Sequence, residues 1–285
     1  RDAAAILRPM ITLESFVRGA WQRGNGRPKT LQDPTRETDI AHCDSTGLDF
    51  AGAVAWGRSV GGTQLRKVGF AERGRWLKAL SATIHAKRDA LIAVSAENGG
   101  STRGDAKFDL DGATGTLAAY AKLAESLGDE NFLPDGEGVQ LGRTPRYWGQ
   151  HIRVPRPGVA VHINAFNFPA WGMCEKLACS VLAGVPAISK PGTPTALVAY
   201  RVAQVIAESG VLPEGAFQFV CGSLGDTLDH LGPQDTLAFT GSAKTGAMLK
   251  GHARLVGQTP YRQFAHAFNL LTPYRGTDSR LRLIA

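Results

Sequence analysis

Residues 50 to about 128 carry apolar side chains with the spacing of helices. These side chains recur at three- and four-residue steps through Phe70, Trp76, Leu77, Leu80, Ile84, Leu91 and Val94. Such a period places one apolar stripe along each helix. A further helix is predicted over residues 112–127. The first half of the chain therefore predicts a layer of amphipathic helices.

From residue 158 onward, short apolar runs alternate with longer helical stretches. The runs are VAVHI at 159–163, PAISK at 186–190, FQFVC at 217–221 and TLAFT at 236–240. Helices are predicted after them over 171–182, over 194–208, near 224–231 and from Ser242. Four strands that are each followed by a helix imply a parallel sheet with right-handed crossovers, which is the doubly wound α/β fold class.

Polar and glycine residues follow each of these predicted strands. They lie at 164–167, Lys190, 222–225 and 240–242. Because ligands bind at the carboxyl ends of the strands in such sheets, these positions are the candidate site.

The other stretches are less regular. Residues 10–26 predict a short strand and a Gly-rich turn, and residues 135–157 become polar and rich in Pro and Gly. A strand pair is predicted around 147–154. We therefore expect residues 135–157 to form a projecting arm.

Composition excludes several classes of protein. With 43% hydrophobic and 20% charged residues, the 285-residue chain is of ordinary globular type. The last 35 residues hold five arginines and one acid, so they carry +4 of the net +7 and leave 7 − 4 = +3 elsewhere. Nucleic-acid binding is therefore not expected. Without a long apolar run or a leader-like start, the chain is predicted to be cytoplasmic, with no membrane span.

Two motifs leave alternatives open. In NAFNFP, Asn167 at a strand end either offers its amide to a developing oxyanion or only turns the backbone before Pro169 opens a helix. In SKPG, Lys190 either reaches a phosphate or ribose over the sheet edge or is a surface lysine.

A third motif, AFTGSAKTG at 238–246, combines a strand end, Gly241 and a serine at a helix start, which suits an anion. It is not a P-loop, because Lys244 and Thr245 precede Gly246, and no GxGxxG fingerprint follows the strands.

The remaining reactive side chains are predicted to be structural. The four cysteines show no spacing typical of zinc ligands or of a disulfide framework, so buried reduced thiols are expected. His162, Cys174 and Cys179 are assigned to packing rather than to chemistry.

Taken together, VAVHINAFNFPAWGMCEKLA, PAISKPGTPTA, GVLPEGAFQFVCG and LAFTGSAKTG, in this order, resemble the aldehyde dehydrogenase superfamily. The sequence INAFNFP and the upstream segment GSTRGDAKFDLDGATGTL resemble those of a narrower group of enzymes in bacterial aromatic-compound degradation. That group comprises dehydroadipyl-CoA semialdehyde dehydrogenase and the aldehyde dehydrogenase part of the phenylacetate ring-opening enzyme. The resemblance covers residues 10 to 258.

The resemblance implies an NAD(P)-binding domain at 10–140 and 158–258, and an oligomerisation arm at 141–157. It gives Asn167 the oxyanion-stabilising role and places Lys190 on the adenosine ribose. The other implied cofactor-binding residues are Ile163, Asn164, Ala165 and Phe166 along the nicotinamide, Gly241 and Ser242 at the pyrophosphate, and Gly222 and Thr245. NAD-preferring members have a glutamate where this chain has Thr193, so NADP is the expected cofactor, with NAD as the alternative.

Family chemistry also requires a cysteine nucleophile and a glutamate, both of which follow the TGS turn at 240–242 in the sequence. No cysteine follows Cys221, and Asp278 is the only acid after Asp235. Residues 259–285 show no family pattern and resemble the product of a shifted reading frame. We therefore expect a truncated member without its catalytic domain.

The function implied by the resemblance is NADP-dependent oxidation of a CoA-linked or aromatic-degradation semialdehyde. The alternatives are a non-catalytic nucleotide-binding remnant and a pseudogene product that does not fold. The family forms homo-oligomers, and assembly of this chain is left open.

Overall fold

A computed structural model describes residues 10–256, 259 and 261–264 of the chain. The helices are α1 Phe50–Trp56, α2 Gly62–Arg66, α3 Phe70–Ala86, α4 Arg88–Gly99, α5 Arg103–Leu127, α6 Pro169–Leu182, α7 Ala196–Glu208 and α8 Ala243–Lys250. A π-helical turn, η1 Gly57–Gly61, joins α1 to α2, and two 3-10 turns are η2 Thr193–Thr195 and η3 Thr227–His230. The strands are β1 Ile11–Leu13, β2 Ser15–Val17, β3 Ala20–Gln22, β4 Lys29–Asp33, β5 Thr38–Cys43, β6 Leu133–Pro134, β7 Val139–Gln140, β8 Trp148–Gly149, β9 Ile152–Arg153, β10 Ala160–Ile163, β11 Ala187–Lys190, β12 Phe217–Phe219, β13 Thr236–Thr240 and β14 Tyr261–Phe264.

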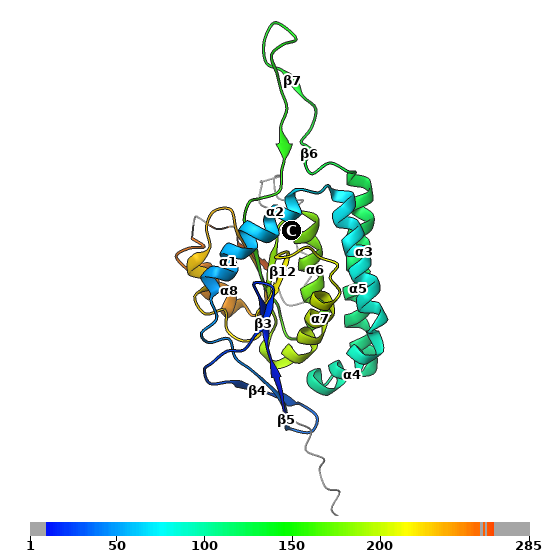
Figure 1. Cartoon of the computed structure of the whole chain (residues 1–285), viewed down its shortest axis with the longest axis vertical. Helices are drawn as coiled ribbons and strands as arrows, with labels where there is room; N and C mark the ends of the chain where they lie inside the picture. Colours follow the sequence, from blue (N-terminus) through cyan, green and yellow to red (C-terminus); the bar gives the residue numbers. More distant parts are fainter. Residues whose placement is uncertain (1–9, 257–258, 260, 265–285) are drawn as a thin grey trace, which may run out of the picture.

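The centre of the molecule is a sheet that lies between the helices (Figure 1). Its strand order is β14-β13-β10-β11-β12-β2-β3. Neighbouring strands from β14 to β12 are parallel, whereas β2 and β3 join as antiparallel edge strands. The four strands predicted in the second half of the chain are β10 to β13, so the doubly wound parallel core is confirmed. A smaller sheet has the order β1-β5-β4.

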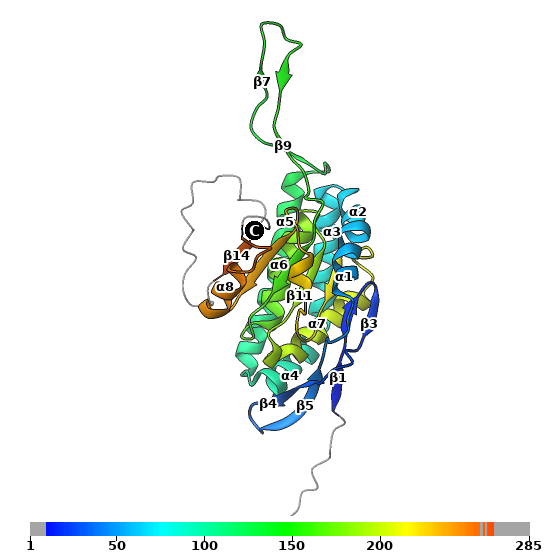
Figure 2. The same ribbon diagram turned by 90° about the vertical axis from the view of Figure 1, so that its left-hand side faces the viewer.

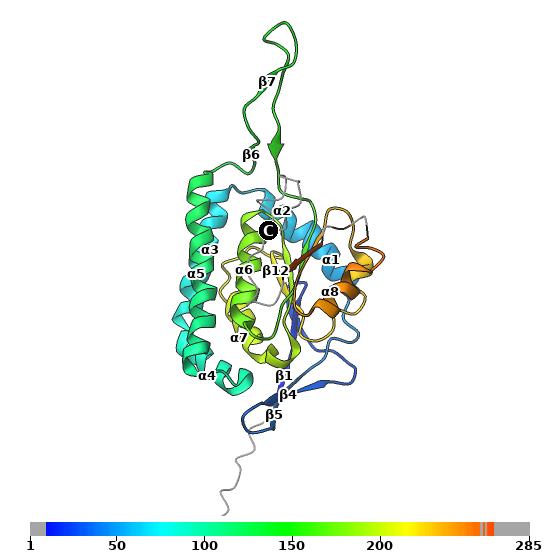
Figure 3. The same cartoon turned by 180° about the vertical axis from the view of Figure 1, so that it is seen from behind.

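Alternating side chains of the central sheet face two separate apolar clusters. Val159 and Val161 point to the cluster that includes α1 and α8, while Ala187 and Phe217 point to the cluster under α3 to α7. Figures 1 and 3 show α3, α5, α6 and α7 together on one side and α1 and α8 on the other. Strands buried on both faces are therefore apolar at nearly every position.

The helices largely follow the prediction, with three differences. The helix predicted over 112–127 begins at Arg103, because Thr102 caps it by accepting the Asp105 N–H. The helix predicted from 194 starts with the 3-10 turn η2, and the one predicted near 224–231 is only the 3-10 turn η3.

The segment between α5 and β10 forms a long projecting hairpin, visible at the top of Figure 1. Its ladders pair β6 with β9 and β7 with β8. Two strands, β8 and β9, do lie in the predicted stretch 147–154, but the prediction that they pair with each other was wrong, because each pairs with an upstream strand. The hairpin ladders begin at Leu133, before the arm predicted from residue 141.

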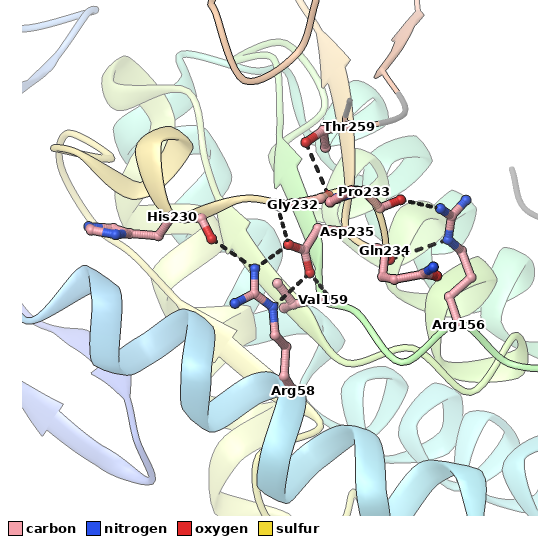
Figure 4. A network of polar contacts seen from close by, with 9 residues as sticks. All are labelled: Arg58, Arg156, Val159, His230, Gly232, Pro233, Gln234, Asp235 and Thr259. Atoms are coloured by element: carbon pink, nitrogen blue, oxygen red, sulfur yellow. Dashed lines mark hydrogen bonds and ion pairs between the residues drawn. The ribbon is translucent and has the colours of Figure 1, made fainter. Parts of the chain in front are cut away.

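Asp235 fixes the starts of the two central strands β10 and β13 (Figure 4). Its buried carboxylate accepts the Val159 N–H at 2.8 Å and the Gly232 N–H at 2.7 Å. Arg58 from the helical layer forms an ion pair with the same carboxylate. Because this buried carboxylate is paired and hydrogen-bonded, it holds the starts of β10 and β13 at a fixed relative height.

β14 pairs with β13 in parallel at the edge of the sheet, as Figure 2 shows beside α8. β14 falls within the stretch 259–285, for which no family pattern was expected. Within that stretch, the structure describes only Thr259 and β14. Among the helices described here, none is long and apolar enough to cross a bilayer.

Candidate functional site

The sheet reverses its direction of winding between β10 and β13. From β10 the chain adds β11 and β12 on one side, whereas β13 lies on the other side of β10. Helices that leave two adjacent strands toward opposite faces open a crevice at their carboxyl ends, where ligands of such sheets bind. The predicted residues lie along this edge: Ile163, Asn164, Ala165, Phe166 and Asn167 after β10, Lys190 at β11, Gly222 after β12, and Gly241 and Ser242 after β13.

A cavity of about 290 Å³ opens at this reversal point. Its lining residues are Phe108, Ala165, Asn167, Phe168, Trp171, Gly172, Glu175 and Thr240. Of the predicted site residues, Ala165 and Asn167 lie on its wall. Phe108, Trp171 and Glu175 were not predicted, because their sequence context is that of ordinary helix positions.

Three aromatic rings make the outer wall of the cavity. The centroid of Phe108 lies 6.0 Å from that of Phe168 and 5.4 Å from that of Trp171, in edge-to-face arrangements. The Trp171 indole N–H donates to Thr116 Oγ1 at 2.9 Å. Such packing gives an apolar wall to the cavity that Asn167 also lines.

A carboxylate from α5 fixes the turn between β10 and α6, which carries Asn167. Pro169 opens α6 without an N–H, and Asp109 accepts the next two N–H groups, from Ala170 at 3.1 Å and Trp171 at 2.8 Å. Asp109 thus caps a helix to which it does not belong. Burial raises the pKa of Asp109 to about 6, against the lowering effect of these two hydrogen bonds.

The other predicted residues of the β10 end point in different directions. Asn164 is buried and donates to Ser189 Oγ at 3.0 Å, and Ile163 packs against the apolar cluster of α1 and α8. Phe166 is 51% exposed, and its carbonyl accepts from Thr195 Oγ1 at 2.6 Å. The loop after β10 is therefore braced on the loop after β11.

Lys190 lies at the end of β11 in a largely buried position. Burial lowers the pKa of its ammonium, and the thiols of Cys221 and Cys43 lie close enough to act on its charge. Thr193 is half-buried in η2, the turn that follows. Asn98 holds this turn by donating to the Pro194 carbonyl at 2.9 Å.

Gly222 has φ +141°, and a side chain there would collide with Ser45. Only glycine adopts this backbone conformation readily, so the close approach of the two segments requires it.

The end of β13 leads directly into the N-terminus of α8. Ser242 is the N-cap, and its Oγ accepts the Thr245 N–H at 3.2 Å. Gly241 packs on the Phe239 ring. In the described part of the chain, the buried Thr240 Oγ1 has no hydrogen-bond partner. The positive end of a capped helix and an unsatisfied hydroxyl thus face the same edge of the sheet.

The described thiols and His162 lie away from the cavity wall. Cys174 is fully buried, and burial raises its thiol pKa; Cys179 is hydrogen-bonded to Tyr120. Burial lowers the pKa of His162 to about 3, so its imidazole is neutral at pH 7. These positions agree with the packing roles predicted for them.

Comparisons with known proteins identify the fold and family. The aldehyde dehydrogenase family matches residues 21–258. The chain is 42% identical over 247 residues to 3,4-dehydroadipyl-CoA semialdehyde dehydrogenase of Aromatoleum evansii, covering 87% of this chain and 48% of that protein. The chain thus spans about half the length of the curated relatives it matches.

Two solved structures share the fold at low sequence identity. The NAD-dependent benzaldehyde dehydrogenase from Corynebacterium glutamicum has a TM-score of 0.75 at 20% identity, over 89% of this chain and 54% of that one. The NADP-dependent glyceraldehyde-3-phosphate dehydrogenase from Bacillus halodurans, complexed with NADP, has a TM-score of 0.73 at 19% identity, over 88% and 52%.

Proposed function

The chain belongs to the aldehyde dehydrogenase family, and from this premise we propose that it carries the nucleotide site and the oxyanion amide of an NADP-dependent semialdehyde dehydrogenase. The observation that supports this most is the cavity at the reversal point of the sheet, with Asn167 on its wall. Lys190 and the α8 N-terminus lie along the same edge, at the carboxyl ends of the strands, where ligands of such sheets bind.

The residues of this edge fit a nicotinamide dinucleotide. The α8 N-terminus behind Gly241 and Ser242 suits the pyrophosphate, and the Lys190 ammonium suits the ribose hydroxyls. The unsatisfied Thr240 hydroxyl and Ala165 lie at the cavity, on the nicotinamide side. When bound, the cofactor supplies a hydride acceptor.

Asn167 and the aromatic wall have separate roles in this proposal. Its side-chain amide donates to the aldehyde oxygen, whose negative charge grows when a nucleophile adds to the carbonyl. Phe108, Phe168 and Trp171 surround the rest of the substrate and exclude water. Asp109 keeps the turn that carries Asn167 in place by accepting the first two N–H groups of α6.

The proposed substrate is a CoA-linked semialdehyde. The support is the 42% identity to a relative of that name, together with a mostly apolar cavity that suits an acyl chain.

A second candidate is a nucleotide-binding protein that does not oxidise aldehydes. The specific observation in its favour is that, in the described residues, no cysteine lines the cavity. Mixing the purified chain with NADP and a semialdehyde separates the two candidates, because only a dehydrogenase forms reduced cofactor.

The preference for NADP is proposed from Thr193, which brings no negative charge near a ribose phosphate. Thr193→Glu should weaken NADP binding by about tenfold or more and strengthen NAD binding, because a carboxylate repels the phosphate and accepts from the two ribose hydroxyls. Calorimetric titration of both cofactors measures the two dissociation constants.

Thr144→Glu, on the exposed arm, is the matched control and should leave both constants unchanged. Equal effects of the two substitutions would exclude Thr193 from the ribose site. Failure of wild-type chain to bind either cofactor would contradict the nucleotide site itself.

A further inference from the structure

Glu175 is the one charged residue on the cavity wall among the residues described. It lies on α6, one turn after Trp171 and Gly172, and all three face the cavity. Its side chain is 43% exposed, so its carboxylate is accessible to a ligand that fills the cavity.

The cation paired with Glu175 lies behind it. Lys176 Nζ is 3.0 Å from Glu175 Oε1 and also donates to the Gly172 carbonyl at 3.1 Å. The Lys176 side chain is only 5% exposed and is not part of the cavity wall. A ligand in the cavity therefore meets the carboxylate and not the ammonium.

The other lining side chains carry no formal charge. Phe108, Phe168 and Trp171 contribute rings, and Ala165 and Gly172 contribute almost no side chain. Asn167 and Thr240 offer neutral polar groups. Among the described side chains that line the cavity, Glu175 is therefore the one that carries a formal charge.

We propose that Glu175 is a specificity-determining residue, which admits semialdehydes whose far end is an uncharged thioester, ester or amide and excludes those whose far end is a free carboxylate. This inference rests on the function proposed above. With the carbonyl oxygen at Asn167 and the acyl chain against the rings, the far end of the substrate comes to Glu175.

Two effects act against a free carboxylate in this position. The apolar wall removes water from it, which costs free energy whatever residue stands at 175. The Glu175 carboxylate adds repulsion, which is strong at a partly buried site and is reduced by salt. Only the second effect disappears when Glu175 loses its charge, so the two can be separated.

The experiment compares two inert ligands of the same length. The methyl ketones 6-oxoheptanamide and 6-oxoheptanoate carry the carbonyl for Asn167 and end in an amide or a carboxylate. Their dissociation constants are measured by ligand-observed NMR on the full chain with saturating NADP. Glu175→Gln keeps an acceptor for Lys176, and Glu125→Gln, on the exposed surface of α5, is the matched control.

In wild type, the amide should bind about fivefold to tenfold more tightly than the carboxylate at low salt. Glu175→Gln should reduce that ratio at least threefold by strengthening carboxylate binding alone, and raised salt should act in the same direction in wild type only. Glu125→Gln should keep the wild-type ratio.

Two results overturn the inference. Equal binding of the two ketones to wild type, or an unchanged ratio in Glu175→Gln, shows that Glu175 does not select the far end while leaving the aldehyde site in place. Absence of binding by either ketone instead contradicts the proposed function, and the inference with it.

Discussion

At the scale of single residues, the buried side chains of Arg73 and Asp109 are held by backbone groups rather than by opposite charges. The Arg73 side chain is fully buried and donates to the carbonyls of Leu65, Val68 and Leu182. Leu65 and Leu182 lie at the C-terminal ends of α2 and α6, where the helix dipole favours a cation. Burial lowers the pKa of Arg73 to about 10, so it stays charged at pH 7.

Arg73→Met should lower the free energy of unfolding by about 2–4 kcal/mol, because three buried carbonyls lose their donor. Urea unfolding followed by circular dichroism measures it. Arg75→Met, two residues along the same helix with an exposed side chain, should change the free energy by less than about 0.5 kcal/mol. Equal losses in the two variants would contradict the role given to Arg73.

Asp109 predicts a pH dependence of stability with a defined sign. Its pKa rises from an ordinary 3.8 to about 6 on folding, because burial disfavours the carboxylate. The folded state therefore binds the proton more tightly, so the stability contribution is complete below pH 3.8 and is lost as the pH rises through 6. Between these two pH values, the unfolding free energy of wild type should fall by on the order of 2 kcal/mol because of Asp109. Asp109→Asn should not show this fall, because its side chain does not titrate.

Asp111 is the control for the sign of this effect. Its hydrogen bond from Arg88 lowers its pKa, so its contribution is lost only as the pH falls below its ordinary range. Unfolding free energies of wild type, Asp109→Asn and Asp111→Asn, measured from pH 4 to pH 7, should show the Asp109 effect alone. A wild-type slope in Asp109→Asn would refute the raised pKa.

At the scale of elements, close approaches decide how helices pack. A side-chain atom on Gly112 of α5 would lie 2.4 Å from the Trp171 ring, so glycine allows the ring to seat against the helix. A side-chain atom on Gly61, in the π-helical turn, would lie 2.0 Å from the Gly215 carbonyl oxygen. The helical layer therefore meets the turn before β12 backbone to backbone.

Gly61→Ala should destabilise the fold by about 1–3 kcal/mol, because backbone on the other side of the contact cannot move aside as a side chain can. Gly115→Ala, in α5 with open space around the site, should instead stabilise by about 0.5–1 kcal/mol through helix propensity. Thermal and urea unfolding of both variants test the opposite signs. Stabilisation by Gly61→Ala would rule out the tight contact.

At the scale of the whole molecule, the arm exposes apolar side chains far from the core. Val139, Leu141, Tyr147, Trp148, Ile152 and Val154 are each more than half exposed. Apolar side chains gathered on a projecting hairpin are typical of an interface. We therefore propose that the arm pairs this chain with a second copy.

Leu141→Asp combined with Trp148→Asp should convert that assembly to single chains, because charged side chains oppose burial of the arm. Sedimentation velocity gives the mass of each species in solution. Met248→Asp, at an exposed apolar position of α8, should leave the assembly intact. Single chains in the wild-type protein, or an unchanged mass in the double variant, would contradict the proposal.

Much of the fold and part of the site follow from the sequence, because the signals are local. Short apolar runs, each followed by a stretch with helical spacing, predicted the strands β10 to β13. Because these strands are parallel, the residues that follow them lie at one edge of the sheet. Asn167 and Ala165, which follow β10, lie on the cavity wall at this edge.

Contacts between distant segments were decided by the tertiary structure. Strand order placed β13 beside β10, and packing of α5 on α6 brought Phe108 and Asp109 to the start of α6. Asn164 turned to Ser189 in the interior rather than to the cavity. The apolar period of a helix shows which side is buried but not what that side meets, so the aromatic wall and the exposure of Glu175 to the cavity appeared only when the segments packed.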